Sequence, residues 1–161
     1  MNIFDFAIEF ERELHDYYQE KSKNAPNEYM RKLFAELAAE ELKHEQIVLQ
    51  LRAEKMVEEV ESDIKEKARD FFQRMVDELP EMIFPEDEVE IYKQAVELER
   101  KSKEFYLEQA EKADLAHVRR VFKQLAEEER KHQEIMENLA EMLDRPNTWL
   151  EDAEWNHMEE Y

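Results

Sequence analysis

"LAAEELKH" at residues 37–44 returns as "LAEEERKH" at residues 125–132, and this pair decides the fold. An offset of 88 positions aligns residues 3–53 with 91–141 without a gap, and 18 of the 51 aligned positions are identical. Many of the identities are apolar, so the two segments are predicted to be copies of one structural unit. Because the apolar residues recur at helical spacing, each copy is predicted to be a helical hairpin.

Each copy breaks near its middle, at "NAPN" (24–27) and at "KADLAH" (112–117), where turn and cap residues gather. Between the copies, "ESDIKEKARDFFQRMVDEL" (61–79) has apolar residues at helical spacing, and Pro80 and Pro85 follow it. In the tail, the capping-box pattern from Thr148 to Glu151 predicts a short last helix. We therefore predict core helices at about 2–23, 27–58, 87–112 and 114–143.

The sequence thus predicts an all-α protein that forms a single domain over residues 1–161. Two repeated hairpins joined by a long, helix-containing crossover are typical of a four-helix bundle. The predicted parts are repeat 1 at about 3–53, the crossover at about 54–87, repeat 2 at about 88–143 and the tail at 144–161.

Composition agrees with a helical protein and narrows its function. The chain has no Gly, 41% charged residues and a net charge of −20, which disfavours nucleic acid and anionic membrane surfaces as partners and favours cations. It has no Cys, so thiolate catalysis and Cys-ligated iron are excluded within it. No stretch is apolar enough to span a membrane and the start lacks a signal-peptide pattern, so we expect a cytoplasmic protein.

Polar side chains interrupt the apolar stripes of all four core helices. In the first helix, Glu11 lies on the face of Ala7, Leu14 and Tyr18, and the second repeat places Glu99 likewise before Tyr106. The helices that follow each carry Glu-x-x-His on their inward face. The six inward polar residues are Glu11, Glu41, His44, Glu99, Glu129 and His132.

The spacing places the four glutamates at one level of the bundle. Glu11 and Glu41 lie 13 and 15 residues from their hairpin turn, or about 20 Å at 1.5 Å per residue, and Glu99 and Glu129 have the same separation. Buried carboxylates need protons or cations, and no Lys or Arg shares these stripes. Two divalent ions balance four carboxylates, so we predict a dinuclear site for iron, with manganese or zinc as alternatives.

Other candidates are weaker, because Glu is so frequent that Glu-x-x-His arises by chance. Glu154–His157 has no mate in the repeat and is interpreted as accidental. His15 has Lys103 as its mate and is expected at the solvent edge, and His117 falls in a hairpin turn. Tyr18 and Tyr106 are equally well interpreted as core tyrosines or as groups that assist the site.

The segments "AIEFERELHDYY", "LAAEELKH", "AVELERKSKEFY" and "LAEEERKH" resemble the rubrerythrin-like branch of the ferritin-like superfamily. The resemblance covers about residues 3–141, and Glu from two helices with Glu-x-x-His from two others is the ligand set of di-iron carboxylate bundles. It implies that Glu41 and Glu129 bridge two metals. It also implies that Glu11 and Glu99 are terminal ligands, that each metal takes one histidine, His44 or His132, and that Tyr18 and Tyr106 are hydrogen-bond donors to ligand carboxylates.

The sequence departs from those relatives in places. Rubrerythrins with a rubredoxin domain carry Cys-ligated iron, so without Cys an external donor, such as a rubredoxin-like protein, is expected to supply electrons. Ser102 stands where they have an extra Glu, and Leu42 stands where bacterioferritins have a haem-binding Met.

The resemblance implies a non-haem di-iron oxidoreductase that reduces peroxide or dioxygen. Two alternatives stay open: a ferroxidase, iron-storage or iron-delivery protein, and a metal-free interaction module that uses Trp149 and Trp155. We also expect a homodimer, and the long crossover permits domain swapping.

Overall fold

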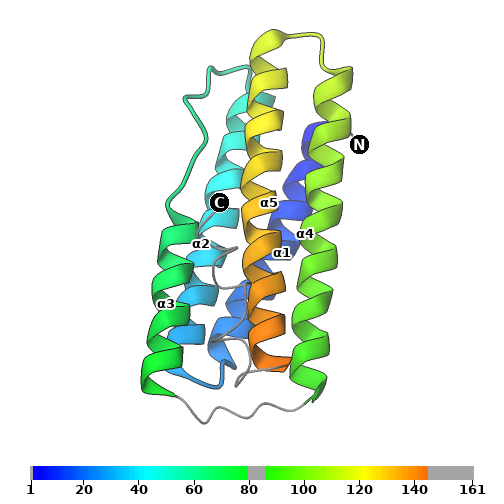
Figure 1. The fold of residues 1–161 in the computed structure, drawn as a ribbon. Coiled ribbons are helices and arrows are strands. Elements are labelled where there is room, and N and C mark those ends of the chain that lie inside the picture. The colour runs from blue at the N-terminus through cyan, green and yellow to red at the C-terminus, as the bar shows by residue number, and fades with distance from the viewer. Residues whose placement is uncertain (1, 80–85, 145–161) are drawn as a thin grey trace.

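The chain forms an all-α bundle in a computed structural model that describes residues 2–79 and 86–144 (Figure 1). The helices are α1 (Ile3–Lys23), α2 (Glu28–Arg52), α3 (Ile64–Glu78), α4 (Glu86–Lys112) and α5 (Ala116–Asp144). The predicted bundle of two hairpins with a helix in the crossover is confirmed. The short last helix predicted near Thr148 lies outside the described residues, and the division into one domain stays a prediction. In the part of the chain that is described, no helix is long and apolar enough to cross a membrane.

Local sequence signals explain where the first hairpin begins its helices. The side chain of Asn2 accepts a hydrogen bond from the backbone N–H of Asp5, and the side chain of Asn27 accepts one from Met30 N. Both are N-cap interactions that satisfy backbone donors of the first helical turn.

The predicted end of the second helix near residue 58 is wrong, because α2 ends at Arg52. Glu54 adopts a left-handed conformation with φ of 60°. The N–H groups of Glu54 and Lys55 bond to the carbonyls of Leu51 and Gln50 at 3.0 and 2.9 Å, the pattern of a Schellman cap. Glycine is the residue that usually indicates this cap in a sequence. Because this chain has no glycine, no residue in the sequence indicated that the helix ends here.

The two hairpins pack face to face. α1 runs antiparallel to α2 and α4 runs antiparallel to α5, while α1 also contacts α4 and α2 contacts α5 (Figure 1). α3 lies outside this four-helix core, against α2 and α5 (Figure 1). Ile64, Ala68, Phe72 and Met75 are its buried face, at the helical spacing that the sequence predicted.

Residues 53–63 connect α2 to α3 and run along the outside of the bundle; we call this segment the strap (Figure 1). The N–H of Val57 donates to His117 Nε2 at 3.2 Å, and the N–H of Val60 donates to Gln124 Oε1 at 3.1 Å. His117, expected only in a turn, is therefore a half-buried anchor for the strap.

The apolar core is divided into two clusters, one in each half of the bundle. Along α1, Ala7 belongs to one cluster and Leu14 to the other. Along α2, Val48 and Ala38 are divided in the same way. The inward polar residues of both helices lie between these positions, so the predicted polar layer crosses the middle of a dry core.

Candidate metal centre

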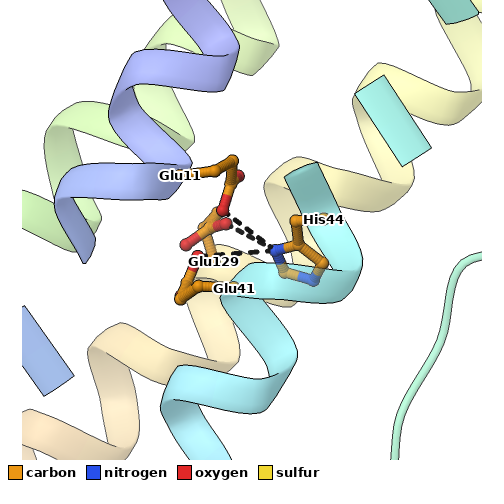
Figure 2. Close-up of side chains that lie close together, drawn as sticks. All are labelled: Glu11, Glu41, His44 and Glu129. Atoms are coloured by element: carbon orange, nitrogen blue, oxygen red, sulfur yellow. Dashed lines mark hydrogen bonds and ion pairs between the residues drawn. The ribbon is translucent and has the colours of Figure 1, made fainter. Parts of the chain in front are cut away.

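The structure brings all six inward polar residues together at the middle of the bundle. Each core helix contributes: Glu11 comes from α1, Glu41 and His44 from α2, Glu99 from α4, and Glu129 and His132 from α5. Five of them are fully buried, and His44 is 2% exposed. Figure 2 shows Glu11, Glu41 and Glu129 pointing at the ring of His44.

Their ligand atoms form two overlapping groups of four. One group holds Glu11, Glu41, His44 and Glu129, and the other holds Glu41, Glu99, Glu129 and His132, with ligand atoms within 4.8 Å of one another. Glu41 and Glu129 belong to both groups. Two buried Glu/His clusters that share two carboxylates have the composition that a dinuclear metal site requires.

Each histidine reaches across to the shared glutamate of the opposite hairpin. His44 Nδ1 lies 2.8 Å from Glu129 Oε1, and His132 Nδ1 lies 2.6 Å from Glu41 Oε1. The two imidazole rings are nearly parallel, with an interplanar angle of 7° and centroids 5.6 Å apart. Both Nδ1 atoms therefore face the carboxylates, and both contacts connect the hairpins.

The two tyrosines predicted near the site also act across the hairpins. The Tyr18 hydroxyl donates to Glu99 Oε1 at 2.7 Å, and the Tyr106 hydroxyl donates to Glu11 Oε1 at 2.7 Å. Both tyrosines are fully buried. A hydroxyl donor in a dry core orients the carboxylate and satisfies one of its oxygen atoms.

Burial and mutual repulsion set the charges of the metal-free centre. Burial, together with the charges of neighbouring glutamates, raises the pKa values of Glu41 and Glu129 well above the ordinary range. Burial also acts to raise the pKa of Glu11, but the hydrogen bond from Glu41 and the charge of His44 outweigh it and lower this pKa to about 2. Burial opposes protonation of His44, yet the charge of Glu11 and hydrogen bonds to Glu11 and Glu129 raise the His44 pKa. The neutral form is therefore favoured at the two shared carboxyls, and the charged form is favoured at Glu11.

The unpaired atoms of the centre fit metal ions. The Oε2 atom of each of the four glutamates is buried and has no hydrogen-bond partner. Among the described residues, the ion pairs of these glutamates are made only with the two histidines. Four carboxylate oxygens without partners in a buried core cost several kcal/mol unless protons or cations satisfy them, and metal ions can satisfy all four.

Other histidines considered in the sequence lie elsewhere. His15 Nδ1 lies 3.2 Å from exposed Asp16, away from both groups. The Glu154–His157 match and both tryptophans of the tail lie outside the described residues.

Sequence reasoning missed a second pair of buried carboxylates, Glu40 and Glu128, which are 5% and 2% exposed. They are repeat mates, and each neighbours a shared glutamate in the sequence. Lys43 pairs with Glu40 at 3.5 Å, and Lys131 pairs with Glu128 at 2.5 Å. Their identity in both copies was the available signal.

Comparison with known proteins agrees with this geometry. Neither curated proteins nor solved structures show a significant match to the chain. The sequence profile described as Rubrerythrin matches residues 2–140 and, in an overlapping second placement, residues 90–159. With no Cys among its 161 residues, the sequence contains no rubredoxin-type iron site. A profile match over nearly the whole length, together with two buried Glu/His groups that share two glutamates, shows that the chain belongs to the rubrerythrin family.

Proposed function

We propose that the protein is a non-haem di-iron oxidoreductase that reduces peroxide or dioxygen with electrons from an external donor. The observation that carries this proposal is the overlap of the two four-residue groups at Glu41 and Glu129. Shared carboxylates hold two ions close together, as two-metal chemistry requires.

The proposed ligands divide evenly between two ions. Glu11 and His44 would serve one ion, Glu99 and His132 would serve the other, and Glu41 and Glu129 would serve both, since they belong to both groups. Mixed carboxylate and imidazole ligation suits iron, with manganese and zinc as alternatives. When bound, the reduced iron pair supplies the two electrons that convert hydrogen peroxide and two protons into two water molecules.

The chain's own residues prepare the site for this chemistry. Tyr18 and Tyr106 hold the terminal carboxylates in place from the opposite hairpin. The two apolar clusters exclude bulk water on both sides of the polar layer. A dry site strengthens electrostatic interactions and limits side reactions of a strong oxidant.

All six proposed ligands belong to one chain, and the domain swapping that the long crossover permits stays a prediction. The external electron donor and the oxidant are both proposals, and the homodimer stays a prediction.

Iron content and redox stoichiometry test the proposal. We expect iron-loaded protein to hold about two iron atoms per chain and one equivalent of peroxide to oxidise the reduced pair. Glu41→Gln, which removes a shared ligand, should hold no iron pair, whereas Glu13→Gln on the exposed side of α1 should load normally. Normal loading of Glu41→Gln would refute the proposed ligand set.

Iron handling is the second candidate, because the net charge of −20 attracts Fe²⁺ in either role. A ferroxidase or storage protein oxidises many equivalents of Fe²⁺ per chain without an organic or protein donor. Repeated turnover of added Fe²⁺ with mineral formation would favour this function over peroxide reduction.

A further inference from the structure

The crossover covers the two halves of the repeated centre unequally. The beginning of α3 packs against the part of α5 that carries His132, where Lys65 Nζ lies 3.6 Å from Glu134 Oε2. Just before α3, Ser62 at the end of the strap accepts a hydrogen bond from Lys131 Nζ at 3.4 Å. The half that carries His44 is covered instead by the strap. A helix buries its apolar face continuously, whereas the strap contributes one buried apolar side chain, Val57.

The two histidines, which the repeat makes equivalent, differ for this reason. His132 is fully buried, and its Nε2 atom has no hydrogen-bond partner. His44 alone among the six residues of the centre has exposed surface, and it lines a cavity. The next helical turn repeats the contrast, because Ile135 is fully buried whereas its mate Ile47 is partly exposed and lines the same cavity.

This cavity of about 320 Å³ lies between α2, the strap and α5. Figure 2 shows the strap passing on the side of His44 that faces away from the three glutamates. A second cavity of about 390 Å³ lies nearer the beginning of the strap. Both cavities are lined by Ile47, Glu59 and Val60. Ile47 on α2 and Val60 on the strap therefore lie where the two cavities adjoin, next to the cavity that His44 lines.

The cavity wall is predominantly acidic. Its lining includes four carboxylates and one amine, and the carboxylates are those of Glu40, Glu59, Glu61 and Glu128. Three of them are paired with cations, Glu40 with Lys43, Glu128 with Lys131 and Glu59 with Arg120. Glu61 is exposed and supplies the negative charge that these pairs leave unbalanced. A wall of this charge slows the approach of anions and leaves a neutral molecule such as hydrogen peroxide unhindered.

We infer that this cavity is the entrance through which a small neutral oxidant reaches the metal centre, at the edge of His44, whereas the described residues around His132 leave its side chain no exposed surface. The inference rests on the proposed function, since it names how the oxidant of that reaction arrives. The strap belongs to the crossover and has no counterpart in either repeat. The inference therefore gives the crossover a role that the duplicated hairpins do not have.

The test narrows the cavity and measures how fast small probes reach iron. In rapid-mixing experiments, nitric oxide serves as the neutral probe of ferrous-loaded protein and azide as the anionic probe of ferric-loaded protein. Ile47→Trp should slow the binding of both probes by about tenfold, the effect of roughly 1.4 kcal/mol on the barrier, with iron content unchanged. Leu42→Trp, on the exposed side of the same helix, should bind both probes at the wild-type rate.

Charge is tested separately. Glu61→Lys should accelerate azide binding at low salt and leave nitric oxide binding unchanged. Glu66→Lys makes the same charge change at an exposed position of α3 outside the cavity and should have no comparable effect. Val60→Trp narrows the cavity from the strap, so the inference stays testable if Ile47→Trp fails to fold.

Each result has one meaning. Equal probe rates in the narrowed variants and in Leu42→Trp overturn the entrance, and equal azide rates in Glu61→Lys and Glu66→Lys overturn the exclusion of anions. If iron-loaded protein reacts with peroxide but is insensitive at positions 47 and 60, the entrance fails while the proposed function stands. A wild-type chain that holds no iron pair refutes both.

Discussion

Loading the protein with two divalent ions should release protons, because ligand groups that carry a proton must lose it to bind metal. Glu41 and Glu129 have pKa values raised well above the ordinary range, by burial first and by neighbouring carboxylates second. Burial acts to lower the pKa of His44, but the charge of Glu11 and the hydrogen bonds of His44 with Glu11 and Glu129 outweigh burial and raise this pKa. We therefore expect these three groups to be the source of the released protons. Glu11 and Glu99 have lowered pKa values and release none.

The sign of the pH dependence follows from the directions of these pKa shifts. The metal-free protein binds more protons than the loaded protein, so raising the pH favours loading. Each proton released changes the overall binding free energy by about 1.36 kcal/mol per pH unit.

Calorimetric titration with Mn²⁺ in two buffers of different ionisation enthalpy measures the number of protons released. Glu13→Gln, outside the centre, is the control and should release the same number. Release of fewer than one proton would refute the reasoning, because it would mean that the shared carboxyls are ionised before metal arrives.

Three further substitutions each test one local feature of the structure. Tyr18→Phe removes the donor to Glu99 Oε1 and should weaken metal binding about 10–100-fold in a chelator competition, whereas Tyr17→Phe, whose hydroxyl bonds elsewhere, should not. Ser102→Ala removes a fully buried hydroxyl without a hydrogen-bond partner and should raise the free energy of unfolding of metal-free protein by about 1 kcal/mol in urea. Glu54→Gly relieves a left-handed residue and should raise the same quantity by about 1 kcal/mol.

Opposite results would be informative. Equal metal affinities of the Tyr17 and Tyr18 variants would mean that the hydroxyl of Tyr18 does not hold a ligand. A loss of stability in Ser102→Ala or Glu54→Gly would mean that the hydroxyl or the carboxylate side chain makes an interaction stronger than the cost assigned to it.

Much of the fold followed from the repeat and its helical period. The spacing from Glu11 to Glu41 predicted that two carboxylates meet at one level, and the 88-residue offset extended this to Glu99 and Glu129. The structure places these residues together. Such arguments succeed because helical rise and period are local properties that neighbouring side chains do not alter.

Local patterns failed where the deciding contact was distant or the signal residue was missing. The end of α2 was predicted too late because Glu54, and not glycine, takes the left-handed position. The sequence did not predict that Tyr18 donates a hydrogen bond to Glu99, because these two residues lie 81 positions apart in the sequence, on different helices. The burial of Glu40 and Glu128 likewise depends on packing between α2, α5 and the strap.

The sequence by itself determined the helices, the inward faces and the six side chains that meet at the centre, because periodicity and spacing dictate which residues share a face and a height. Only the tertiary structure decided that the equivalent histidines have unequal surroundings. The repeat treats His44 and His132 alike, but one crossover must cover both halves of the bundle, and it does so with a packed helix on one half and an extended strap on the other. Which half receives the helix depends on long-range packing of α3 against α2 and α5, and no local pattern records that choice.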